Sequence, residues 1–185
     1  MKKMTEVELA ILKSLIGQNF QFVGGPEAPS YLVSDRFLVG GAGWCISISG
    51  DIDFADLGDE SGEYSYLVVR AASQLEVEKT VESGNVYLTN RSGLILDVSI
   101  LAETLTQRKG ETSVWLHEVD VAVLLRLASG YVILKLLSHN MEAILVEFVE
   151  EFSIAKVEPP SNSFVNDDLV SYNSSLRIID LARIE

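Results

Sequence analysis

The sequence VDVAVLLRLASGYVILKLL, residues Val119–Leu137, consists of two apolar runs separated by a small residue and a glycine. Two runs rich in Val, Ile and Leu on either side of such a break are typical of a β-hairpin. We therefore predict a two-residue turn at Ser129 and Gly130. The resulting register places three apolar pairs on one face: Leu127 opposite Val132, Leu125 opposite Leu134, and Val123 opposite Leu136.

The other face of this hairpin is mixed. Arg126 and Lys135 would lie there beside apolar residues, as on a sheet surface that is partly solvated or covered by another element. Together with Asp120, these charges interrupt the run of about 20 apolar residues that a membrane-spanning helix needs. The stretch therefore predicts the centre of a sheet core and not a membrane span.

Short β-type runs separated by turn residues continue along most of the chain, which indicates an antiparallel meander or a partly closed barrel. Before them, Thr5 and Glu8 have the spacing of a helix capping box, and Gly17 supplies a stop signal. We predict an α+β fold, predominantly antiparallel β, with an amphipathic N-terminal helix over residues 5–16. A brief strand follows near Phe20, and the later strands are expected at 31–33, 36–39, 44–49, 64–71, 85–89, 94–101, 114–127 and 131–138.

Three connections follow from local sequence. The glycine-rich residues 40–43 predict a hairpin turn, because the next residues resume strand alternation and no phosphate-binding helix opens after them. Residues 90–93, Asn-Arg-Ser-Gly, predict another turn, leading back to strand 85–89. Residues 141–152 carry a helical apolar stripe but are also rich in strand formers, so helix and strand both stay open.

Length and composition predict one β-rich domain. The chain has 185 residues, and we place this domain at residues 1–157 with the helix included. Pro159 and Pro160 begin a Pro/Ser linker within residues 158–185. The apolar residues that follow predict a short C-terminal segment that docks on the domain or on a second copy of the chain.

The net charge and the single cysteine limit which cellular compartment and which binding partners we expect. A formal net charge of -13 disfavours direct binding to nucleic acid or to an anionic membrane. Cys45 alone forms no intramolecular disulfide, and the N-terminus lacks the apolar run of a signal peptide. We therefore expect a cytoplasmic protein.

Acidic residues concentrate in residues 50–63, where we expect a solvated loop between two strands. Six carboxylates occur there: Asp51, Asp53, Asp56, Asp59, Glu60 and Glu63. The spacing of a calcium-binding loop fails, because Ala55 stands where the fifth position needs an oxygen ligand. We assign no metal and interpret these residues as a surface that binds a basic partner.

The remaining chemistry-bearing residues show no catalytic pattern. His117 shares a strand face with Trp115 and predicts a partly buried histidine, whereas His139 in a turn is expected to be exposed. Cys45 lies in an apolar run and predicts an inert thiol. We therefore assign no catalytic residue and no cofactor, and the question of enzyme activity stays open with a preference for none.

Three hypotheses for function remain. The leading one is a non-enzymatic interaction module whose acidic surface binds a basic protein, as an inhibitor or immunity protein does. The second is a β-barrel that binds or converts a small molecule in a pocket near Trp44, Trp115 and His117, with Tyr64 and Tyr66 beside them. The third is a structural subunit of a homo-oligomer formed through the C-terminal segment.

Overall fold

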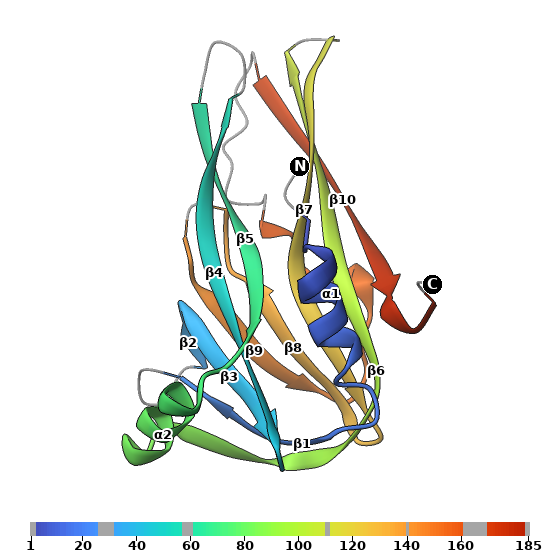
Figure 1. The fold of residues 1–185 in the computed structure, drawn as a ribbon. Helices are drawn as coiled ribbons and strands as arrows, with labels where there is room; N and C mark the ends of the chain where they lie inside the picture. The colour runs from blue at the N-terminus through green and yellow to red at the C-terminus, as the bar shows by residue number, and fades with distance from the viewer. Residues whose placement is uncertain are drawn as a thin grey trace.

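The computed structural model describes residues 3–25, 32–56, 61–109, 112–139, 141–160 and 170–183. These residues form mostly antiparallel sheet with two short α-helices (Figure 1). The helices are α1 (Glu6–Lys13) and α2 (Gln74–Glu82), with 3-10 helices η1 (Ile154–Lys156) and η3 (Leu181–Arg183). The strands are β1 (Asn19–Gly24), β2 (Val33–Ser34), β3 (Arg36–Gly41), β4 (Trp44–Asp56), β5 (Ser61–Ala71), β6 (Val86–Lys109), β7 (Thr112–Leu127), β8 (Gly130–Leu136), β9 (Ile144–Val149) and β10 (Val170–Asp180).

Strand β6 connects the two halves of the sheet. Hydrogen-bonded neighbours follow the order β2-β9-β8-β7-β6-β1-β3-β4-β5, and β10 pairs with β6 beside this path. The first part of β6 pairs with β1, and its second part pairs with β7. The sheet folds back about β6, so that β4 and β5 face β7 and β8 (Figure 1). The predicted antiparallel fold is confirmed, but the sheet of the described strands is open and not a closed barrel.

The hairpin of β7 and β8 is confirmed, but its predicted turn and register are wrong. The turn residues are Ala128 and Ser129, and Leu125 pairs with Val132. The register therefore differs from the prediction by two residues. A shift of two leaves every side chain on its original face, so the same apolar residues still enter the core. Gly130 belongs to β8, where a Cβ would lie 2.2 Å from the Val149 carbonyl oxygen.

Three other local predictions have different outcomes. The turn at residues 40–43 is confirmed, with Gly43 at a φ of 82°, a conformation that favours glycine. The turn at residues 90–93 is wrong, because β6 continues through them where it leaves β1 and joins β7. The open alternative at residues 141–152 is decided in favour of a strand, since β9 pairs with β8 at six positions.

The N-terminal helix is confirmed. Thr5 caps α1, and Glu8 completes the predicted capping box. A Glu8 carboxylate oxygen also accepts a hydrogen bond from the Val69 backbone nitrogen at 3.0 Å. The helix thus binds directly to β5, the last strand of the sheet path. Leu12 is fully buried there.

The C-terminal strand β10 pairs with β6 at eleven positions. It lies within the segment predicted to dock, while the division of the chain at residue 157 and the oligomeric state stay predictions. Residues 161–169 lie outside the described part of the chain. Neither α-helix of the described residues is long and apolar enough to cross a membrane.

Candidate functional site

Four of the six acidic residues lie on strands, so the predicted acidic loop is wrong at these four positions. Asp51, Asp53 and Asp56 belong to β4, and Glu63 belongs to β5; these strands pair from Ile46–Ala71 to Asp56–Ser61. We call residues 50–66 the acidic hairpin. Its strand character was visible in the alternation of aspartates with apolar residues over 51–54, Asp-Ile-Asp-Phe. The side chains of Asp56 and Glu63, and all of Asp59 and Glu60, lie outside the described part.

On one face of the acidic hairpin, each described aspartate lies opposite a tyrosine. Asp51 pairs across the strands with Tyr66, and the Tyr66 hydroxyl donates to Asp51 Oδ2 at 2.8 Å. Asp53 pairs with Tyr64, whose hydroxyl lies 3.4 Å from Asp53 Oδ2. The Ile52 backbone nitrogen also donates to Asp51 Oδ1 at 2.9 Å. These donors orient both carboxylates, and Asp51 remains exposed to solvent.

His117 is buried against Tyr64, as its position on the strand face predicted. The two ring centroids lie 4.2 Å apart in an edge-on arrangement. The pKa of His117 is lowered to about 4, mainly by burial and to a smaller extent by the N-terminal amine and His139, while Asp53 acts in the opposite direction. The imidazole is therefore neutral at pH 7.

The described residues of the predicted aromatic pocket do not all lie together in the structure. Tyr64 and His117 meet, but Trp44 stands nine residues before Asp53 on β4, about 30 Å away along an extended strand. There the Trp44 indole nitrogen donates to the Asn19 carbonyl oxygen at 3.1 Å. The side chain of Trp115 is outside the described part of the chain.

The prediction that His139 is exposed is wrong. Its side chain is 1% exposed, and its Nε2 lies 2.8 Å from Oε2 of Glu103, whose side chain is fully buried. Its Nδ1 lies 3.3 Å from the backbone carbonyl oxygen of Ser65. The Ser65 hydroxyl donates to the Met141 carbonyl oxygen at 2.7 Å. One buried polar cluster therefore joins β5, β6 and the β8–β9 connection.

Both ring nitrogens of His139 have oxygen partners. Nδ1 lies near the Ser65 carbonyl and Nε2 near Glu103, so neither nitrogen is buried away from a hydrogen-bonding atom. Such pairing is what allows a carboxyl and an imidazole to be enclosed in a core. The contacts of the Glu103–His139 pair are those of a structural link between the two halves of the sheet.

A separate group of charged residues surrounds α2, a helix that we did not predict. The missed signal is Ser73 and Glu76, which form the same capping box as in α1. Glu76 also binds Arg36, at 3.3 Å, and Arg70, at 3.0 Å. The hydrogen bonds from Arg70 and Ser73 lower the pKa of Glu76 to about 2. Glu76 is thus ionised at all physiological pH values.

Cys45 lies near the same helix and is half-buried. Burial raises the pKa of its thiol to about 11, and the charge of Glu76 contributes in the same direction. The reactive thiolate form is therefore scarce at pH 7.

The comparisons with known proteins give no relative for this arrangement. No protein-family model matches the chain, and no curated protein or solved structure resembles it significantly. Within the described residues, no three His, Cys, Asp or Glu side chains gather closely enough to hold a metal ion. The function must therefore be argued from the surfaces of this chain alone.

Proposed function

We propose that the protein is a non-enzymatic interaction module and that the acidic hairpin binds a basic protein. The observation that carries the proposal is the pairing of Asp51 and Asp53 with tyrosines on one face of this hairpin. Residues 50–66 contain six carboxylates and no Lys, Arg or His. Their charge is therefore not balanced within the hairpin and is available to a cationic partner.

The tyrosines support binding in a second way. A carboxylate held by a hydroxyl donor loses less side-chain freedom when a partner binds, so less of the interaction energy is spent on ordering it. Tyrosine is also enriched in protein interfaces, because its ring offers apolar contact area beside a polar group. Tyr66 is half-exposed next to the exposed Asp51, which combines both features.

The charge of the acidic hairpin is tested with the double variant Asp51→Asn/Asp53→Asn. The asparagine carbonyls still accept from Tyr66 and Tyr64, so the change removes charge with little change of shape. A fluorescent deca-arginine peptide serves as the probe of a basic partner. We expect the double variant to bind it up to about tenfold more weakly than the wild type in low salt.

The matched control is Glu151→Gln/Glu158→Gln, which removes two exposed carboxylates from elsewhere on the chain. It should bind the peptide like the wild type. Raising the salt from about 0.05 M to about 0.5 M should abolish the difference between the hairpin variant and the control. Equal binding by the two double variants in low salt would show that net charge, and not the hairpin, attracts the peptide.

The natural partner is sought with the full chain as bait. A basic protein retained by the wild type and by the control variant, but not by the hairpin variant, supports the proposal. Retention of a protein that changes neither with salt nor with the Asp51 and Asp53 substitutions contradicts the proposal.

A further inference from the structure

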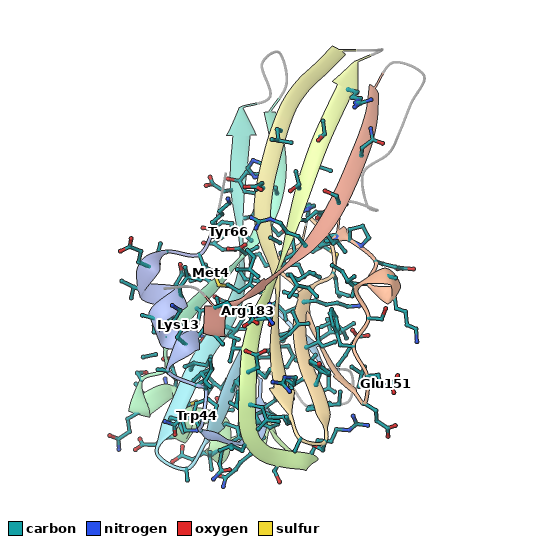
Figure 2. All side chains as sticks on the ribbon, turned by 90° about the vertical axis from the view of Figure 1, so that its right-hand side faces the viewer. Met4, Lys13, Trp44, Tyr66, Glu151 and Arg183 are labelled. Atoms are coloured by element: carbon teal, nitrogen blue, oxygen red, sulfur yellow. The ribbon has the colours of Figure 1, made fainter. Side chains whose placement is uncertain are left out.

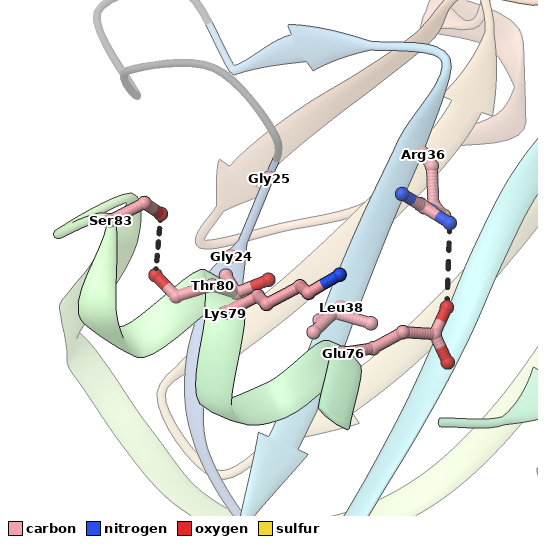
Figure 3. A pocket seen from close by; sticks show the side chains of 8 residues that line it. All are labelled: Gly24, Gly25, Arg36, Leu38, Glu76, Lys79, Thr80 and Ser83. Atoms are coloured by element: carbon pink, nitrogen blue, oxygen red, sulfur yellow. Dashed lines mark hydrogen bonds and ion pairs between the residues drawn. The ribbon is translucent and has the colours of Figure 1, made fainter. Parts of the chain in front are cut away.

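A cleft lies between α2 and strands β1 and β3 (Figure 3), and no residue of the acidic hairpin is among its described lining residues. Its volume is about 410 Å³, within the range of roughly 300–1,000 Å³ typical of small-molecule sites. The lining residues are Gly24, Gly25, Arg36, Leu38, Glu76, Lys79, Thr80 and Ser83.

The cleft is basic, although the protein as a whole is strongly acidic. Arg36 and Lys79 line it, and Glu76 is the one carboxylate among its described lining residues. Glu76 is shared between Arg36 and Arg70, and Lys79 is the second cation that lines the cleft. Arg36, Lys79 and Glu76 leave one net positive charge on the lining of the cleft. An acidic protein that keeps this local excess offers a site for an anion.

The side chains also offer directional donors beside an apolar wall. Lys79 extends over Leu38, with its ammonium group on the side of the cleft where Arg36 lies (Figure 3). Arg36 reaches Glu76 through Nη1 alone, at 3.3 Å, and its side chain is 43% exposed. Guanidinium and ammonium groups together are the usual partners of phosphate oxygens.

Gly24 brings the helix close to the sheet. A Cβ at Gly24 would lie 2.7 Å from the Thr80 methyl carbon, so any larger residue would push α2 outward. Thr80 and Lys79 are thereby held over β1 and β3. The position of the α2 backbone over β1 and β3 is consequently set by close packing at Gly24.

We propose that this cleft binds a small phosphate monoester, with the phosphate between Lys79 and Arg36 and an apolar body against Leu38. The phosphate oxygens would accept from the Lys79 ammonium group and from the Arg36 donors that do not bind Glu76. The proposal does not depend on the acidic hairpin, and the variants that test the two sites do not overlap.

The test is isothermal titration calorimetry of the full chain with phenyl phosphate, inorganic phosphate and benzoate. We expect saturable binding of phenyl phosphate, tighter than that of inorganic phosphate, which lacks the apolar body, or of benzoate, which carries one charge. Lys79→Gln should weaken the binding about tenfold. The matched control Lys156→Gln removes an exposed cation outside the cleft and should leave it unchanged.

Three results would overturn the proposal. One is no saturable binding of phenyl phosphate up to about 10 mM. Another is binding by the Lys79→Gln variant that equals that of the wild type. The third is benzoate binding as tight as that of phenyl phosphate, which would assign the cleft to monovalent anions. Circular dichroism of the Lys79→Gln variant confirms that α2 and the sheet are intact.

Discussion

Two carboxylates of this protein each bind basic side chains, one in the core and the other near the surface. Glu103 contacts His139 at 2.8 Å, and their side chains are 0% and 1% exposed. Glu76 binds Arg70 and Arg36, whose side chains are 46% and 43% exposed. Figure 2 shows how densely side chains fill the interior between the sheet halves. Glu103 and His139 are both among the buried residues.

The difference in exposure predicts that the two carboxylates contribute differently to stability. In the core, either partner left alone becomes an unsatisfied polar group, so the Glu103–His139 pair must stay intact. At the surface, water screens the charges of Glu76 and its arginines and replaces their contacts at low cost. The Glu103–His139 pair should therefore contribute more to the stability of the fold than the contacts of Glu76 do.

The largest expected effect comes from breaking the buried pair. Glu103→Ala should lower the free energy of unfolding by about 3–5 kcal/mol, because His139 loses its partner inside the core. Urea denaturation monitored by tryptophan fluorescence measures this change. A cost below about 1 kcal/mol would mean that the fold does not depend on this buried pair.

A double-mutant cycle with His139→Ala sharpens this test. If the pair acts as a unit, the double variant should cost clearly less than the sum of the two single variants. Strict additivity would show instead that each side chain stabilises the protein through its own packing.

His117 is also buried, and its contribution to the free energy of unfolding depends on pH. Its pKa of about 4 in the folded protein lies below the ordinary value of 6.5, so the unfolded chain takes up the proton first as the pH falls. The stability that the neutral histidine contributes is present above pH 6.5 and is lost between about 6.5 and 4. The loss should be at most about 3 kcal/mol.

Unfolding curves of the wild type and of His117→Gln, recorded across this pH range, isolate the contribution of the histidine. The variant should show a shallower decrease of stability, with the remaining slope due to other groups. Identical slopes would contradict the assigned burial of His117 against Tyr64.

The smallest effect is expected at Glu76. Glu76→Gln should cost about 1 kcal/mol, because solvent screens the arginines and the glutamine still completes the capping box of α2. Thermal unfolding measures the cost, with Glu78→Gln on the same helix as the control. A loss as large as that of Glu103→Ala would mean that the comparison between core and surface does not hold.

The sequence predicted the elements that depend on neighbouring residues. The capping box of Thr5 and Glu8 identified α1, and the apolar runs of Val119–Leu137 identified the central hairpin. The same kinds of local signal occur in α2 and in the acidic hairpin, and a more complete reading of them would have identified both elements. Register was predicted less well, because Ala128-Ser129 and Ser129-Gly130 are both plausible turns and both keep the apolar face inward.

The two candidate sites differ in the same way, because one is formed by neighbouring residues and the other by residues far apart in the chain. The concentration of carboxylates in residues 50–66 was visible in the sequence, whereas Arg36, Lys79 and Gly24 are too far apart in the chain to suggest one cleft. The exposure of His139 was predicted from its turn neighbours, which carry no information about Glu103, 36 residues away.

What the sequence determined by itself was the strand-rich class, the capped N-terminal helix, the apolar face of the central hairpin and the acidic character of one segment. Periodicity and charge encode these properties locally. Only the tertiary structure decided that β6 spans both halves of the sheet, that Glu103 meets His139, and that Arg36 and Arg70 meet at Glu76. These contacts depend on how distant strands are brought together, and burial then determines whether a polar pair is sealed or accessible.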